Sequence, residues 1–213
     1  MTDTLYTVET GTSAQVVAKL LRVLLPDART VCDLTWGSGS FWRGSDADVA
    51  VTGIDINPDR ARDICADFTN LHMVADGAYD VAVFDPPYLA NVSKSNPGLM
   101  GRRFGSYDSV DDVRAAVQAG CREAWRVSRI GCIVKVANHT HGSRSVRMTR
   151  WVEDVFPHDA YGQVELARPH KLLDPKWGEQ LSVYSNSATF LVYRHGDQRH
   201  IRRRRAAALE AAS

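Results

Sequence analysis

The sequence predicts one α/β domain built on a mostly parallel, doubly wound sheet. Short apolar runs typical of strands alternate with amphipathic helical segments along most of the chain. The run 79–85 is almost entirely apolar, as expected of a central parallel strand covered on both faces. With 213 residues, of which 44% are hydrophobic, the chain is large enough for one substantial core. We therefore expect a single domain at 1–195, followed by a basic tail at 196–213.

The predicted helices differ in the signals that support them. Residues 13–25 have apolar side chains at helical spacing and stop at Pro26. Residues 109–128 form an amphipathic segment with a plausible cap at Ser109 and Asp112. Two further helices are expected, a short charged one after Asn57-Pro58 and a longer one at 143–156.

The predicted strands are short, apolar and separated by turn residues. They are expected at 30–36, 47–56, 65–68, 79–85, 131–139, 160–167 and 188–195. The last two have no good helix between them, which predicts an antiparallel pair at the edge of the sheet.

The charge distribution, the cysteines and the lack of long apolar runs limit the kinds of partner and cellular compartment expected for this protein. The formal net charge is +1, yet Arg194 to Arg205 holds six arginines and one aspartate, typical of a solvated end or of a segment attracted to phosphates. The four cysteines show no C-x-x-C spacing and no secretory leader precedes them, so we expect free thiols in the cytoplasm. No stretch approaches the ~18 apolar residues of a membrane span, so no membrane partner is expected.

Glycines and acids follow the first three predicted strands, at the edge where open α/β sheets bind ligands. Gly37 and Gly39 permit a sharp turn and close approach to a ligand, but the third glycine of the dinucleotide fingerprint is missing. Asp55, about twenty residues further on, can bind both ribose hydroxyls. Asp67 can accept a hydrogen bond from an exocyclic amine. Each feature alone is also compatible with a turn, a helix cap or a surface acid; their order favours a site for an adenosine-type cofactor.

The fourth strand ends at Asp85-Pro86-Pro87-Tyr88. Both prolines are rigid and lack an N–H, so the Asp85 carboxylate and the Pro86 carbonyl form a fixed pair of acceptors. An amino group bonded to both would lose planarity and expose its lone pair, while Tyr88 stacks on the ring that carries it. A rigid turn with a buried tyrosine is the structural alternative.

With "DLTWGSGSF" and "GIDINP" upstream, this tetrapeptide resembles the class I S-adenosylmethionine-dependent amino-methyltransferases, especially DNA adenine N6 methyltransferases of the compact type found in phages and mobile elements. The resemblance covers roughly Thr10 to His195. It implies a Rossmann-like fold with a mostly parallel seven-stranded sheet, an antiparallel edge strand and helices on both faces. It also implies S-adenosylmethionine as cofactor and catalysis by Asp85, Pro86, Pro87 and Tyr88. The implied cofactor contacts are Thr10, Gly11, Thr12, Asp33, Thr35, Gly37, Gly39, Phe41, Asp55, Ile56, Asp67 and Phe68.

The chain departs from this family in two respects. Trp36 and Trp42 are bulkier than the usual residues around the glycine loop, and they either wall the cofactor pocket or pack beneath the sheet. A separate target-recognition domain is missing, so sequence readout would fall to loops at 89–107 and 168–186. Both loops are also compatible with ordinary surface loops that have no role in binding. Their candidate substrate contacts are Lys94, Arg102, Arg103, Lys176 and Trp177.

The chemistry excludes some relatives. Carbon-5 methylation of cytosine needs a thiolate, and no cysteine follows a proline or lies near the end of 79–85. Metal-dependent hydroxyl methylation needs a carboxylate cluster of suitable spacing, so no metal is expected. The leading hypothesis is N6 methylation of a flipped adenine in DNA, which makes nucleic acid the expected partner. Cytosine N4, an RNA base amine, a non-catalytic accessory subunit and a nicotinamide-dependent oxidoreductase are the alternatives.

Overall fold

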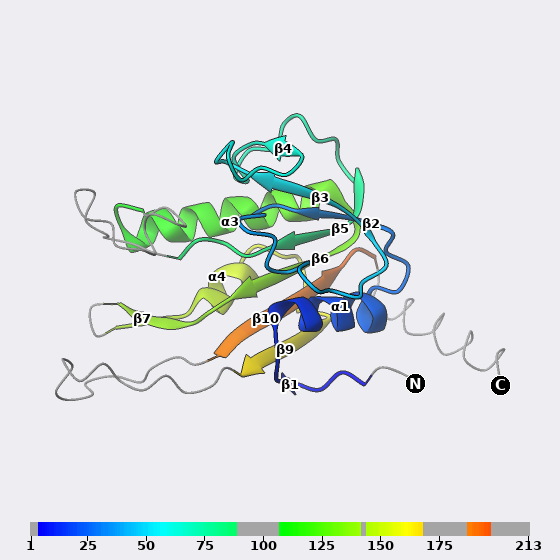
Figure 1. Cartoon of the computed structure of the whole chain (residues 1–213). Helices are drawn as coiled ribbons and strands as arrows, with labels where there is room; N and C mark the ends of the chain where they lie inside the picture. Colours follow the sequence, from blue (N-terminus) through cyan, green and yellow to red (C-terminus); the bar gives the residue numbers. More distant parts are fainter. Residues whose placement is uncertain (1–3, 89–106, 142–143, 168–186, 197–213) are drawn as a thin grey trace.

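An eight-stranded sheet forms the centre of the structure, a computed structural model that describes residues 4–88, 107–141, 144–167 and 187–196 (Figure 1). Its strands, in spatial order, are β1 (Val8–Glu9), β9 (Gly162–Ala167), β10 (Ser187–Arg194), β6 (Ser128–Val136), β5 (Tyr79–Phe84), β2 (Thr30–Asp33), β3 (Ala50–Asp55) and β4 (Ile64–Cys65). The helices are α1 (Ser13–Leu24), α3 (Val110–Val127) and α4 (Met148–Glu153). Strands β7 (His139–His141) and β8 (Arg144–Val146) form a separate two-stranded hairpin.

The sheet is mostly parallel, as predicted. All neighbouring pairs run parallel except those of β10, which is antiparallel to both β6 and β9. Two details of the prediction are wrong. The sheet has eight strands, because Val8–Glu9 adds β1 beside β9. The antiparallel strand β10 lies inside the sheet and not at its edge, since it pairs with β6 on one side and β9 on the other. Its side chains are buried along nearly its whole length, whereas those of β9 are partly exposed.

Helices cover both faces of the sheet, which completes the Rossmann-like arrangement expected from the sequence (Figure 1). Helix α1 packs Val16, Val17 and Leu20 against one face, where they join a single core cluster. Helices α3 and α4 contribute to a second cluster on the other face. Within the described residues, no helix combines the length and apolar character needed to cross a bilayer.

The helix starts agree with the sequence signals. Ser109 caps α3, since its hydroxyl accepts a hydrogen bond from the backbone N–H of Asp112 at 3.1 Å. Thr12 caps α1 in a reciprocal pair with Gln15. Because α1 and α3 run opposite to the parallel strands, both caps lie at the end of the sheet where these strands terminate (Figure 1).

The segment 143–156 is where the prediction fails most. Instead of one long helix it contributes β8 and the six-residue helix α4. The side chains of Val146 and Met148 are buried, while Arg147 between them is exposed, so burial follows the two-residue period of an extended chain. The expected helix after Asn57 is also reduced to a single turn, in which Ala61 donates to the Asn57 carbonyl.

Candidate active site at the ends of the central strands

Asp33 is the last residue of β2, and its side chain is almost fully buried. Its Oδ1 accepts a hydrogen bond from the backbone N–H of Thr35 at 3.0 Å, and its Oδ2 accepts one from Trp42 Nε1 at 2.7 Å. Burial raises the pKa of Asp33 to about 7, aided by the charges of Asp85 and Asp55 and opposed by the two hydrogen bonds. Asp33 therefore anchors the glycine loop, and the acids that end three neighbouring strands lie near one another.

The glycine loop is shaped by Trp36. Gly37 and Gly39 adopt positive φ angles of 56° and 66°, which a side chain would strain. The Trp36 indole lies against Gly39 and against Gly53 of β3, where an added Cβ would come within 2.5 Å of the ring. The Arg62 guanidinium lies 5.1 Å from the centre of the same ring. Trp36 thus packs on the glycine loop and on the neighbouring strand β3.

Asp55 is the last residue of β3 and organises the other side of the loop. Its Oδ2 accepts the backbone N–H of Gly37 at 2.8 Å, and its Oδ1 accepts that of Asn57 at 2.9 Å. An ionised carboxylate offers about four acceptor positions, so each oxygen can still take another donor. The neighbouring Ile56 is 64% exposed, an open apolar surface beside this acid.

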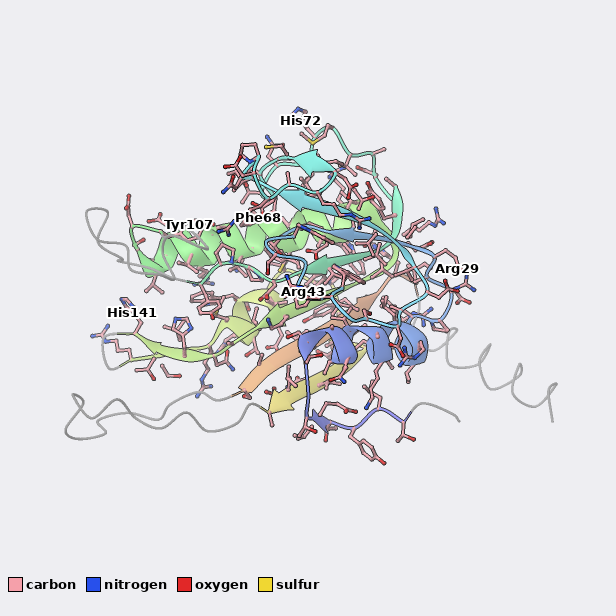
Figure 2. The ribbon with its side chains drawn as sticks, in the orientation of Figure 1. Arg29, Arg43, Phe68, His72, Tyr107 and His141 are labelled. Carbon is pink, nitrogen blue, oxygen red and sulfur yellow. The ribbon has the colours of Figure 1, made fainter. Side chains whose placement is uncertain are left out.

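Asp67 and Phe68 follow the short strand β4. Asp67 is exposed, and its Oδ1 accepts both the backbone N–H and the hydroxyl of Thr69 at 2.8 Å. The Phe68 ring lies 5.1 Å from that of Phe84, beside helix α3 (Figure 2). Burial raises the pKa of Tyr107 to about 12, with the Asp67 charge acting in the same direction. Tyr107 therefore belongs to the surroundings of Asp67, which the sequence did not reveal.

Asp85 extends from the end of the fully buried run 81–84 of β5. Its backbone N–H donates to the Thr35 hydroxyl at 3.0 Å, which links it to the glycine loop. Its Oδ2 accepts a hydrogen bond from Lys135 Nζ at 2.7 Å. The ion pair is well shielded, with 12% of the Lys135 side chain and 28% of the Asp85 side chain exposed. Within the described part of the chain, Oδ1 of Asp85 receives no hydrogen bond.

The residues after Asp85 form the wall of the same corner. Pro86 is buried, and Pro87 and Tyr88 are half-buried. The Tyr88 ring lies 5.9 Å from the ring of His139, at an interplanar angle of 44°. His139 belongs to β7, so the hairpin reaches the tetrapeptide at the end of β5.

Two other predicted contacts have structural roles. Phe41 is buried in the core, 6.4 Å from Phe190, and its ring lies 5.1 Å from Lys135 Nζ. Thr12 caps α1, and Gly11 before it has a φ of 106°. Cofactor contacts from Phe41 and from 10–12 remain predictions. Five predicted substrate contacts lie outside the described residues: Lys94, Arg102, Arg103, Lys176 and Trp177.

The sequence did not identify Lys135, Tyr107 and His139 as residues of this site, and it did not show that Trp42 bonds to Asp33. Lys135 had a readable signal, since it is the one charged residue in the otherwise apolar run 131–136. Trp42 was noticed, but its bond to Asp33 depends on a turn that the sequence pattern does not specify.

No family model matches this sequence, and no curated protein matches it. Among solved structures, the chain is similar to Thermoplasma acidophilum 1320, with 17% identity, a TM-score of 0.48, and coverage of 85% of this chain and 90% of that one. It is also similar to a SAM-dependent methyltransferase from Archaeoglobus fulgidus, with 10% identity, a TM-score of 0.45, and coverage of 83% and 92%. A 16S rRNA N2 methyltransferase from T. thermophilus, in complex with AdoMet and guanosine, matches with 17% identity and a TM-score of 0.41, over 86% of this chain and 41% of that one. At these values the likenesses carry no conclusion about activity.

Proposed function

We propose that this protein is an S-adenosylmethionine-dependent methyltransferase that methylates an exocyclic amine of a nucleobase, N6 of adenine in DNA. One observation carries the proposal: Asp85, followed by Pro86 and Tyr88, extends from the buried central strand β5, beside the acids that end β2 and β3. This is the edge at which open α/β sheets bind their ligands.

The residues at this edge fit the proposed cofactor. Asp33, Asp55 and Asp85 bring three carboxyl groups together, and within the described residues Lys135 is the one cationic side chain bonded to them. Asp85 is paired with Lys135 and burial raises the pKa of Asp33 to about 7, so Asp55 is the carboxylate of the three that best complements a positively charged sulfonium. Asp55 keeps acceptor positions for ribose hydroxyls, and the exposed Ile56 offers an apolar surface for adenine. When bound, the cofactor would supply an electrophilic methyl group.

The amine to be methylated would be held by two acceptors. One N–H would donate to Oδ1 of Asp85, since Oδ2 already accepts a hydrogen bond from Lys135, and the other would donate to the Pro86 carbonyl. With both hydrogens engaged, the nitrogen lone pair points away from the acceptors, and Tyr88 stacks on the ring. Pro86 contributes no competing N–H.

Catalysis would then depend mainly on position and charge. The nitrogen and the methyl carbon need to be about 3–3.5 Å apart and in line. As the nitrogen forms its bond to the methyl carbon, the carbon–sulfur bond of the donor would break and leave a neutral thioether. The nitrogen would carry positive charge, which the Asp85 carboxylate lies close enough to stabilise, and it would then release one proton to solvent to give the neutral methylated amine. A base in a duplex would have to leave the stack to reach this corner.

The decisive experiment incubates the purified protein with a labelled methyl donor and, in separate reactions, duplex DNA, RNA or protein, and then identifies the modified nucleoside or residue by mass analysis. We expect N6-methyladenine. Label found only in cytosine, RNA or protein would overturn the choice of substrate.

Two variants separate cofactor binding from catalysis. Asp55→Ala should weaken S-adenosylmethionine binding strongly in calorimetry, whereas Asp85→Ala should bind the cofactor, remain folded and transfer no methyl group. Binding of NAD in place of S-adenosylmethionine would contradict the proposal altogether.

A further inference from the structure

The β7–β8 hairpin is the part of the described structure that the proposed mechanism leaves without a role. His139, Thr140 and His141 pair in antiparallel register with Val146, Ser145 and Arg144. The hairpin continues from β6 and projects past the end of the main sheet where β5 and β6 terminate (Figure 1). Figure 2 shows His141 toward its outer end.

The base of the hairpin is held firmly. The Asn138 Oδ1 atom, just before β7, accepts hydrogen bonds from the backbone N–H and the hydroxyl of Thr149, just after β8, at 3.1 and 3.4 Å. Val146 is buried in the same core cluster that packs against Tyr88. The hairpin is therefore a fixed extension of the sheet at its attachment point.

One face of the hairpin continues outward from the proposed amine site. Side chains alternate between the faces of a strand pair, and the observed register puts His139, His141, Arg144 and Val146 on the same face. At the inner end of this face, Val146 is buried and the His139 ring lies 5.9 Å from that of Tyr88. At the outer end are His141 and the exposed Arg144. We call His139, His141 and Arg144 the hairpin face.

The stretch of sequence that contains the hairpin is rich in arginine and lacks acids. The sequence contains no aspartate or glutamate from 124 to 152. Arg144, Arg147 and Arg150 are exposed, and no salt bridge among the described residues involves them. Other arginines of the chain, such as Arg126 and Arg114, do pair with acids. Basic side chains without acidic partners suit a polyanion.

We propose that the hairpin face binds the phosphodiester backbone of duplex DNA beside the base held at Tyr88. This inference rests on the proposed function and names the surface that would hold its substrate. A base stacked on Tyr88 remains joined to its neighbours through phosphates, and the hairpin face leads outward from that ring to the exposed Arg144. Phosphate contacts of this kind set register and orientation without reading sequence.

The test measures binding of a fluorescently labelled, adenine-containing duplex by anisotropy over a series of salt concentrations. Arg144→Gln should weaken binding by about 3- to 10-fold and lower the slope of log K against log salt by about one. Adding His141→Gln should weaken it further. The matched control is Arg122→Gln, since Arg122 is exposed on α3 and engaged in no salt bridge among the described residues.

Calorimetry with S-adenosylmethionine separates the two proposals. If the wild type binds both the cofactor and the duplex, and Arg144→Gln binds the duplex with unchanged affinity, the proposed role of the hairpin face is wrong. The proposed function then still stands. An equal loss in Arg122→Gln also overturns the role of the hairpin face, because the attraction would then be spread over the whole surface. A wild-type protein that binds neither cofactor nor DNA overturns the proposed function itself.

Discussion

Lys135 is the residue whose replacement tests the candidate site most directly. Its ammonium holds Oδ2 of Asp85 at 2.7 Å and so fixes the orientation in which Oδ1 would meet an amine. In Lys135→Met the carboxylate loses that partner, and we expect kcat for methyl transfer to fall by about 10- to 100-fold, because small misplacements of reacting groups are costly. KM for the cofactor should change little. Steady-state kinetics on the DNA substrate measures both.

Two companion variants give this prediction its controls. Lys135→Arg keeps a cation beside Asp85 and should recover part of the rate. Lys19→Met breaks a different ion pair, with Glu9 at 2.8 Å on α1 and β1, and should leave kcat unchanged. A Lys135→Met enzyme with the wild-type rate would show that the ion pair has no positioning role.

Asp33 predicts a pH dependence of stability. The pKa of its buried carboxyl is raised to about 7, above the value of about 3.9 in an unfolded chain. Between these values the folded state keeps a proton that the unfolded state has lost. The contribution of Asp33 to the free energy of unfolding therefore falls as pH rises through this window, by an amount on the order of a few kcal/mol.

The variant Asp33→Asn isolates this effect because it cannot ionise. The single carbonyl oxygen of asparagine can accept from either the Thr35 N–H or Trp42 Nε1, and its NH₂ group then faces the other donor, which gives an offset that does not depend on pH. Urea unfolding of both proteins from about pH 4.5 to about pH 7.5 should show the variant gaining stability relative to the wild type. A difference that stays constant across the range would contradict the raised pKa of Asp33.

At the scale of elements, α3 lies unusually close to β5 where Gly120 faces Phe84. A Cβ at Gly120 would overlap Phe84 Cζ. Alanine gains about 1 kcal/mol over glycine in a helix, but overpacking costs about 1–3 kcal/mol. We expect Gly120→Ala to lower the free energy of unfolding in urea. Combined with Phe84→Leu, which removes the opposing ring atoms, it should cost less than the sum of the two single changes.

Elements were predictable where local signals agreed. The apolar period of 13–25 and the Ser109 cap indicated α1 and α3 nearly to the residue. The segment 143–156 combined arginines, Val146 and Met148 in an order compatible with either period. Its hairpin is decided by burial of those two apolar side chains and by the Asn138–Thr149 contact, neither of which is local in sequence.

At the scale of the whole molecule, the parallel sheet and the location of the site were predictable, because strand ends bearing Asp33, Asp55 and Asp85 must meet at one edge. The partners of these acids were not. Lys135 and Asp85 are separated by 50 positions, and only the pairing of β5 with β6 brings them together. The position of β10 inside the sheet likewise depends on its pairing with both β6 and β9, which the sequence of a single segment does not show.

The insertion of β10 between β6 and β9 has a consequence for synthesis on the ribosome. Strands β2 to β6 can pair in the order in which they emerge, but β9 and β1 remain unconnected to that half of the sheet until Ser187–Arg194 has been made. A nascent chain stopped before Ser187 would leave the edge of β6 open to other chains. Strand β1, the first of the described strands in the chain, therefore depends on β10, the last of them, for its connection to the rest of the sheet.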